Sequence, residues 1–161
     1  MMNIKSQTGF VDVLIRPILL VEDNPMDIDF ALQAFTKNKI NNPVVICRDG
    51  EEALAFIQTH TTPDDLQLPA LVLLDLHLPK VDGFEVLHEC RQHDIWKQIP
   101  VVVLTISHDI TDISRAYQLG ANSYIVKPLN LADFTEMMLY INAYWLQINQ
   151  PPFPECSRKK L

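Results

Sequence analysis

The sequence predicts an α/β protein built on a doubly wound, five-stranded parallel sheet. Five short apolar runs recur along the chain, separated by polar turns and stretches with helical periodicity. Short continuous apolar runs are typical of parallel strands that are buried on both faces. Strands that alternate with helices favour a parallel sheet with right-handed crossovers. The chain of 161 residues is long enough for one such domain.

The first part of the chain holds three of the expected strands, at 18–21, 44–47 and 71–75. After the first strand, Asp23-Asn24-Pro25 supplies a helix cap and an early-helix proline. The helix that follows carries one apolar stripe, formed by Ile28, Ala31, Leu32 and Phe35. Asp49-Gly50 turns the chain into a second helix. The polar segment 60–69 contains two prolines and is expected to be a long surface loop.

The second part begins with a helix whose start carries Asp82 and Glu85 at the spacing of a capping box. Strands are expected at 101–105 and 123–126, with a helix between them that stops at Gly120. The last helix is expected at 131–146, with a core-facing stripe, and prolines at 151–154 end the regular structure. We therefore expect a domain over 16–147, an N-terminal extension over 1–15 and a C-terminal tail over 148–161.

Composition limits the function classes. Hydrophobic residues make up 48% of the chain and charged residues 20%, as in soluble globular proteins. The net charge of −7 argues against a nucleic-acid surface. The basic triplet at 158–160 reads as a solvated tail. No run is long enough to span a membrane and no secretion signal is present, so we expect a cytoplasmic protein with buried, reduced cysteines.

Acidic residues follow two of the predicted strands, and this arrangement indicates a cation site. Glu22 and Asp23 follow the first strand, and Asp75 ends the third. Ligands of open α/β sheets collect at the carboxyl ends of the strands. Carboxylates that converge there repel one another unless a cation neutralises them. We expect Mg²⁺, or Mn²⁺ in its place, bound directly by Asp23 and Asp75, through water by Glu22, and by the peptide carbonyl of His77.

Two further residues fall at strand ends on the same edge. Thr105 ends the fourth strand and would offer a hydroxyl to a phosphoryl oxygen. Lys127 follows the fifth strand, and a cis bond to Pro128 would aim its ammonium into the cleft. Taken singly, each has an ordinary structural explanation: Asp75 as a turn cap, Thr105 as a strand residue and Lys127 as a surface lysine. The imidazole of His77 is expected at the rim, because no second histidine stands at ligand spacing.

These residues resemble the receiver domain of two-component response regulators. VEDN, LLDLHLPKVDGFEVL, VVVLT and YIVKP occur in the family's order over roughly residues 16–147. The resemblance implies a flavodoxin-like sheet with strand order 2-1-3-4-5. It also implies that Asp75 takes phosphate from a histidine kinase, and that Glu22 and Asp23 hold Mg²⁺. Thr105, Lys127 and Tyr124 fall on the switch positions of a phosphoacceptor protein that is not otherwise an enzyme.

A narrower resemblance links the chain to stand-alone regulators partnered with cyanobacterial phytochromes. It rests on the 60–69 loop, the LTIS segment and the ending NLADF…INAYWL. It implies a phytochrome as the kinase and a homodimer without an output domain. Tyr140 and Tyr144 lie one helical turn apart beside Met137, so they are either incidental surface residues or a partner surface formed with the preceding helix and strand.

One position departs from the receiver pattern. The residue after the switch threonine is usually small, but here it is Ile106, which would narrow access to Asp75. His77 and Ser107 flank the water path to the phosphoryl group and are expected to tune its hydrolysis. A phosphorylation-independent docking module with a receiver fold is therefore the alternative function. An aspartate-dependent phosphatase would carry a second Asp at 77, and a flavin phosphate would be repelled by the acidic turn.

Overall fold

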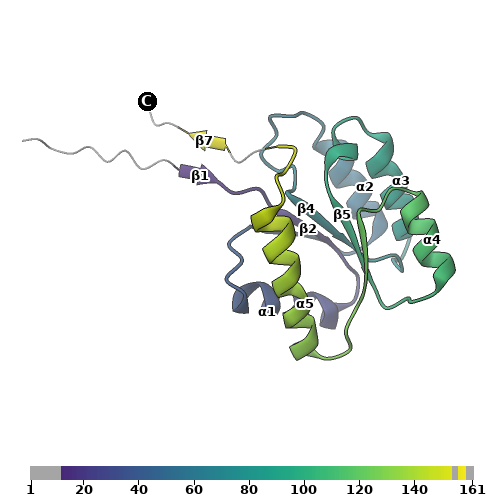
Figure 1. Ribbon diagram of the computed structural model, residues 1–161. Helices are drawn as coiled ribbons and strands as arrows, with labels where there is room; N and C mark the ends of the chain where they lie inside the picture. Colours follow the sequence, from purple (N-terminus) through teal and green to yellow (C-terminus); the bar gives the residue numbers. More distant parts are fainter. Residues whose placement is uncertain (1–11, 154–155, 159–161) are drawn as a thin grey trace, which may run out of the picture.

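The computed structural model of the protein describes residues 12–153 and 156–158, and its centre is a five-stranded parallel sheet (Figure 1). The strands are β2 (Ile18–Val21), β3 (Val44–Cys47), β4 (Leu71–Leu74), β5 (Val101–Thr105) and β6 (Ser123–Val126). They stand in the order β3-β2-β4-β5-β6, and every neighbouring pair is parallel. Taken in chain order, this is the predicted 2-1-3-4-5 arrangement, so the predicted fold class is confirmed.

Each of the five α-helices begins after an Asn or Asp side chain that accepts hydrogen bonds from backbone N–H groups of the first turn. The helices are α1 (Pro25–Lys37), α2 (Gly50–Thr59), α3 (Gly83–Gln92), α4 (Ile110–Gln118) and α5 (Leu131–Ile141). Their caps are Asn24, Asp49, Asp82, Asp109 and Asn130. For α1 the cap is Asn24, so the preceding Asp23 is left available to the edge of the sheet.

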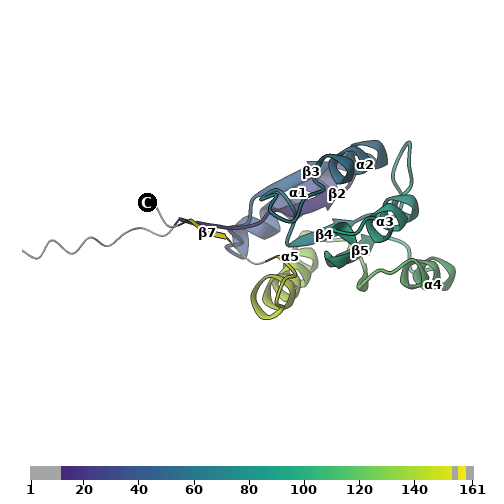
Figure 2. The same ribbon diagram turned by 90° about the horizontal axis from the view of Figure 1, so that it is seen from above.

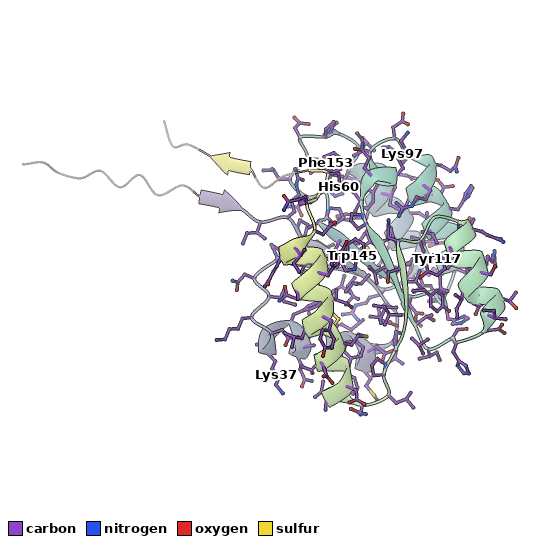
Figure 3. All side chains as sticks on the ribbon, in the orientation of Figure 1. Lys37, His60, Lys97, Tyr117, Trp145 and Phe153 are labelled. Atoms are coloured by element: carbon purple, nitrogen blue, oxygen red, sulfur yellow. The ribbon has the colours of Figure 1, made fainter. Side chains whose placement is uncertain are left out.

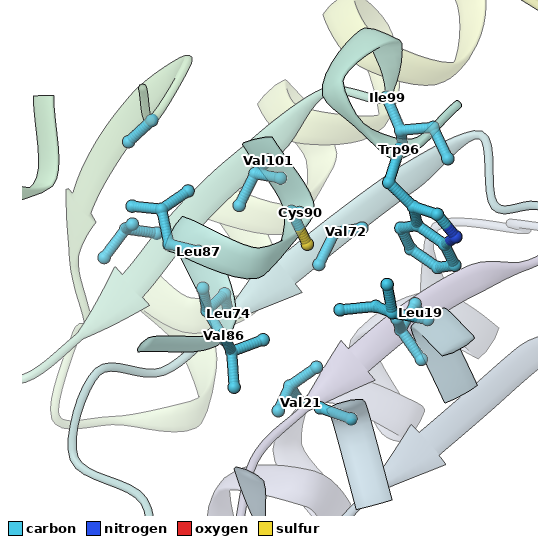
Figure 4. Packing of buried hydrophobic residues seen from close by; sticks show 14 of the residues in the cluster. Leu19, Val21, Val72, Leu74, Val86, Leu87, Cys90, Trp96, Ile99 and Val101 are labelled. Atoms are coloured by element: carbon cyan, nitrogen blue, oxygen red, sulfur yellow. The ribbon is translucent and has the colours of Figure 1, made fainter. Parts of the chain in front are cut away.

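Helices cover both faces of the sheet (Figures 1 and 2). On one face, Leu20, Leu73 and other alternate strand residues pack against α1 and α5. On the opposite face, the intervening strand residues pack against α2, α3 and α4 (Figure 4). Trp96, in the 3₁₀ helix η1 (Trp96–Gln98), is fully buried there and donates its indole N–H to the carbonyl of His60 at 2.7 Å.

The turn between β4 and α3 is held close to the sheet, and this fixes the position of Asp75. The amide of Gly83 donates to the carbonyl of Leu76 at 2.9 Å. A Cβ atom at Gly83 would lie 2.2 Å from the carbonyl oxygen of Asp75, so only glycine fits. Lys80 lies between Leu76 and Gly83 in the same turn, and its ammonium is 3.1 Å from the carboxylate of Asp49. Both ends of the turn are therefore anchored.

The segment 60–69 is less exposed than its polar sequence predicts. Leu68 is fully buried, and the buried guanidinium of Arg16 donates to the carbonyls of Asp65 and Leu68 at 2.8 and 3.4 Å. The same guanidinium donates to the carbonyl of Phe153 at 3.1 Å, which ties the chain beyond α5 to this loop (Figure 3). The sequence gives no sign of this contact because its partners are backbone carbonyls far apart along the chain.

Three expectations about the end of the chain and the β6–α5 turn need correction. The last helix does not stay α-helical to residue 146, because a π-helical segment, η2 (Asn142–Ile148), follows α5. Regular structure does not end at the prolines, since β7 (Cys156–Arg158) pairs antiparallel with β1 (Asp12–Leu14). The Lys127–Pro128 bond is trans, as are all peptide bonds in the described ranges, because the backbone already delivers Lys127 to the cleft.

Other expectations fall partly outside the described residues. Residues 1–11, 154–155 and 159–161 lie outside them, and with them most of the predicted N-terminal extension, part of the tail and the basic triplet. Cys47 and Cys90 are buried and free, as predicted. Within 12–153 and 156–158, no helix is long and apolar enough to cross a membrane.

Candidate functional site

The carboxyl ends of four sheet strands bring together the polar residues that the sequence singled out. Glu22 follows β2, Asp75 follows β4, Thr105 ends β5 and Lys127 follows β6. All four are buried, although they are polar or charged. Burial of such groups is unfavourable unless they are paired or serve a ligand. The edge of the sheet is therefore the candidate site.

Three carboxylates form the acidic side of this site. Oxygens of Glu22, Asp23 and Asp75 lie within 4.8 Å of one another. Asp23 is exposed, and no hydrogen bond or ion pair is found for it within the described residues, whereas the other two are buried. The cluster is thus open to solvent on the side of Asp23, where a cation would enter.

Lys127 is the basic side of the site, and it contacts one carboxylate that the sequence pattern did not indicate. Its Nζ donates to the carboxylates of Glu22, of Asp75 at 3.2 Å and of Asp27 at 2.9 Å. Asp27 lies in the first turn of α1, four residues after Asp23. Its place in that turn, directly after a strand that ends at the site, is the signal from which it could have been found.

Burial and mutual repulsion shape the charges of the cluster. Burial, and then the charge of Asp75, raise the pKa of Glu22 to about 7, although Lys127 opposes them. For Lys127, burial works against the ammonium, but the charges of Asp75 and Glu22 outweigh it and raise its pKa. Lys127 is therefore held as a cation, and Glu22 carries a proton more readily than an exposed carboxylate does.

These residues fit a hard divalent cation. One ammonium faces four carboxylates in the site, so the negative charge is only partly balanced. Glu22 already has both oxygens bonded, one to Lys127 and one to the amide of Asn24 at 3.1 Å. Asp23 has no such partner among the residues that the structure describes, and it faces solvent, which favours it as a direct ligand. Carboxylate oxygens with room for water are the ligands that Mg²⁺ and Mn²⁺ take.

Thr105 is placed where an additional ligand group would complete its hydrogen bonding. Its Oγ1 is the one buried side-chain nitrogen or oxygen in the described residues that has no hydrogen-bond partner. Its carbonyl accepts the amide of Lys127 at 2.8 Å, which fixes the two residues side by side. A buried hydroxyl without a partner costs free energy, so it indicates a group that binds there at another stage.

A hydrogen-bonded chain connects the rim of the site to β6. The hydroxyl of the half-buried Tyr124 donates to the carbonyl of Ser107 at 2.9 Å. The hydroxyl of Ser107 donates to the carboxylate of Asp112 at 2.6 Å, and Nε2 of His77 lies 3.9 Å from that carboxylate. The side chain of His77 is exposed. The positions expected to tune hydrolysis thus share one partner, Asp112, which the sequence did not identify.

The remaining predicted residues lie at the surface. Ile106 is 61% exposed, so its side chain turns outward from the strand end. Tyr140 and Tyr144 are 65% and 51% exposed and line a groove between β6 and the α5–η2 segment, together with Ile125, Met137 and Trp145. The structure therefore groups the two tyrosines on one face with β6, away from the acidic cluster.

Comparison with known proteins points to one family. The model of the response regulator receiver domain matches residues 18–139. Response regulator Rcp1 of Synechocystis sp. is 42% identical over 132 residues, which cover 82% of this chain and 90% of Rcp1. The probable methanogenesis regulatory protein FilR2 of Methanothrix harundinacea is 42% identical over 137 residues, covering 85% of this chain and 88% of FilR2.

Solved structures give the same result. The Mn²⁺-bound form of response regulator Rcp1 is similar with a TM-score of 0.76 and 41% identity, and the match covers 84% of this chain and 97% of that one. The phosphorylated cyanobacterial phytochrome response regulator RcpA is similar with a TM-score of 0.79 and 39% identity, covering 86% and 99%.

The unpaired hydroxyl of Thr105 leads to a stability prediction. Thr105→Val keeps the shape of the side chain and removes the hydroxyl, so we expect the free energy of unfolding to rise by about 1 kcal/mol. Urea denaturation followed by circular dichroism measures it. Thr135→Val is the matched control, because the Thr135 hydroxyl is bonded to the carbonyl of Leu131 at 2.7 Å and its loss should not stabilise. A fall in stability for Thr105→Val would contradict the conclusion that the buried Thr105 hydroxyl has no hydrogen-bond partner within the described residues.

Proposed function

We propose, from the premise that this chain belongs to the response regulator receiver domain family, that it accepts a phosphoryl group from a histidine kinase on Asp75. One observation carries the proposal. The buried carboxylate of Asp75 contacts the ammonium of Lys127 and lies within the same cluster as the open carboxylate of Asp23. A nucleophile, a cation site and a fixed positive charge therefore meet at one point.

In the proposed reaction, a carboxylate oxygen of Asp75 attacks the phosphorus of a kinase phosphohistidine. The new O–P bond forms as the N–P bond breaks, and the histidine nitrogen leaves with the electron pair. Lys127 would donate to the phosphoryl oxygens and stabilise the charge that develops on them. The hydroxyl of Thr105 would find there the partner that it lacks. The protein is thus a signalling phosphoacceptor, not an enzyme with a separate substrate.

Asp23 and Asp75 would hold Mg²⁺ or Mn²⁺, with Glu22 acting through water and the carbonyl of His77 as a further ligand. When bound, the cation would neutralise negative charge on the phosphoryl oxygens. Rcp1, the relative at 41% identity, has a structure in an Mn²⁺-bound form, which supports the assignment. Reduced, buried thiols and a phosphohistidine donor both suit the cytoplasm, where we place the protein.

The proposed switch runs from Thr105 to Tyr124. Phosphorylation adds roughly −1.5 to −2 charges at neutral pH, by analogy with other phosphorylated side chains. Thr105 would move toward the phosphoryl group and vacate space, and Tyr124 would exchange its bond with Ser107 for an inward position. New bonds that exist only in the phosphorylated form would bias this two-state change. His77, Ser107 and Ile106 would set how quickly water or a donor reaches Asp75.

The partner in the proposal is a phytochrome-type histidine kinase. The similarity to Rcp1 and to the phytochrome response regulator RcpA supports it. Three exposed apolar side chains, Met26, Ile106 and Leu129, lie on the segments that follow β2, β5 and β6, the strands whose ends carry site residues. Ile106 would then contact the donor protein. If it blocks transfer instead, the chain is the alternative, a docking module with a receiver fold.

For output we propose a homodimer through the face formed by α4, β6 and α5. Besides Tyr140 and Tyr144, this face exposes Val126 of β6 and Tyr117 of α4. Figure 3 labels Tyr117 on α4 and Trp145 on the segment that follows α5. Tyrosine and methionine are enriched in interfaces because they bury much apolar area and retain a polar contact. Tyr124 lies on the same strand, so the switch would act directly on this surface.

The first test is chemical phosphorylation. With acetyl phosphate and Mg²⁺, we expect the intact mass to rise by one phosphoryl group. Asp75→Asn should abolish the adduct because it removes the nucleophile, and EDTA should abolish it by removing the cation. Labelling that persists in Asp75→Asn would contradict the assignment of Asp75. No labelling by acetyl phosphate or by a kinase, with Mg²⁺ binding intact, would favour the docking module.

Metal affinity should depend on pH. Glu22 has its pKa raised to about 7, so it is largely ionised at pH 8 and protonated at pH 6. Because a cation favours the ionised form, the affinity for Mg²⁺ should fall between pH 8 and pH 6, by up to about tenfold per pH unit below the pKa. Calorimetric titration at pH 6, 7 and 8 measures this. Glu22→Gln should bind more weakly at pH 8 and lose most of the dependence; an equally steep profile in that variant would refute the role of Glu22.

Dimerisation should depend on the tyrosine pair. We expect phosphorylation to raise the apparent mass in light scattering toward a dimer. Tyr140→Ala with Tyr144→Ala should weaken the dimer by about tenfold or more, as loss of central aromatic contacts does. Leu32→Ala, a partly exposed apolar residue of α1, is the control and should leave dimerisation unchanged. If the tyrosine variant dimerises like the wild type, another surface must carry the contact.

A further inference from the structure

Lys127 has no donor to spare in this structure. An ammonium carries three N–H donors, and Lys127 uses them on Glu22, Asp27 and Asp75. The side chain is almost fully buried, with 3% exposure, so water does not supply alternative partners. On phosphorylation of Asp75, the donor that Lys127 now gives to this carboxylate can pass to a phosphoryl oxygen. A second donor to the phosphoryl group must then come from the bond to Glu22 or from the bond to Asp27.

Of Glu22 and Asp27, Asp27 is released at the lower cost. Its side chain is 22% exposed, whereas that of Glu22 is 4% exposed and would be left buried without its ammonium. A carboxylate that returns to water regains its hydration, while one left unpaired in the interior does not. Asp27 also lies in the first turn of α1, where the helix dipole favours a negative charge after the ammonium has gone.

We propose that Asp27 is a positioning residue that holds the Lys127 ammonium toward α1 until Asp75 is phosphorylated. This inference rests on the proposed function. In it, the Asp27–Lys127 bond exists in the unphosphorylated protein and is exchanged for a bond to the phosphoryl group. The bond therefore stabilises the resting form alone. The negative charge of Asp27, however, also adds to the potential that attracts the divalent cation.

Asp27 thus both holds Lys127 and attracts the cation. Removal of its charge should therefore have opposite effects on the rate of labelling and on the affinity for Mg²⁺. Asp27→Asn removes the charge that competes for Lys127, so labelling by acetyl phosphate at saturating Mg²⁺ should become faster by about two- to fivefold, the size expected for a partly exposed ion pair. The same change should weaken Mg²⁺ binding, measured by calorimetric titration without any phosphodonor, by a similar factor. A purely structural role would lower both quantities.

The matched control is Asp29→Asn. Asp29 is on the same helix and exposed, and no hydrogen bond or ion pair is found for it within the described residues. This variant removes the same charge without touching Lys127, so both quantities should stay near those of the wild type. Asp27→Glu keeps the charge and should restore slow labelling and tight Mg²⁺ binding, and thermal unfolding of each variant reports on its folding.

The outcomes separate this inference from the proposed function. If the wild type is labelled but Asp27→Asn is labelled no faster than Asp29→Asn, the role of Asp27 is wrong and the phosphoacceptor function stands. A fall in both labelling and Mg²⁺ affinity would equally overturn it, as a structural defect. If neither acetyl phosphate nor a kinase labels the wild type, the proposed function fails and this inference fails with it.

Discussion

The structure depends on one electrostatic constraint: a single buried ammonium faces a group of carboxylates at the edge of the sheet. Lys127 pairs with Glu22, Asp27 and Asp75, and Asp23 completes the acidic group without a partner within the described residues. The resting site is thus held together but not neutral. A divalent cation would supply the missing positive charge, and a phosphoryl group would then draw Lys127 away from one of its partners.

The fold maintains this arrangement with ordinary structural elements. Parallel strands deliver residues from four separate parts of the chain to one edge. Asn24 caps α1, which leaves Asp23 to the cleft, and Gly83 lets the turn after β4 pack against the backbone of Asp75. Thr105 and Lys127 are joined by a backbone hydrogen bond. The same edge therefore carries the proposed nucleophile, the candidate cation site and the residues proposed to sense phosphorylation.

The sheet and the residues at its strand ends were predictable because their signals are local. Apolar runs such as Leu71–Leu74 mark buried strands, and polar residues at the ends of four of the five runs mark the site. The contacts that were missed depend on side-chain directions in three dimensions: Asp27 with Lys127, Ser107 with Asp112, and Arg16 with backbone carbonyls. The pairing of β1 with β7 joins the two ends of the chain, and no local pattern announces it.

The most direct test of the central electrostatic claim is a crystal structure grown with Mn²⁺, with data collected at the manganese absorption edge. We expect one anomalous peak bonded to carboxylate oxygens of Asp23 and Asp75, with the ammonium of Lys127 still beside Glu22. An empty cleft at millimolar Mn²⁺, or a peak bonded only to carboxylates elsewhere on the surface, would contradict it.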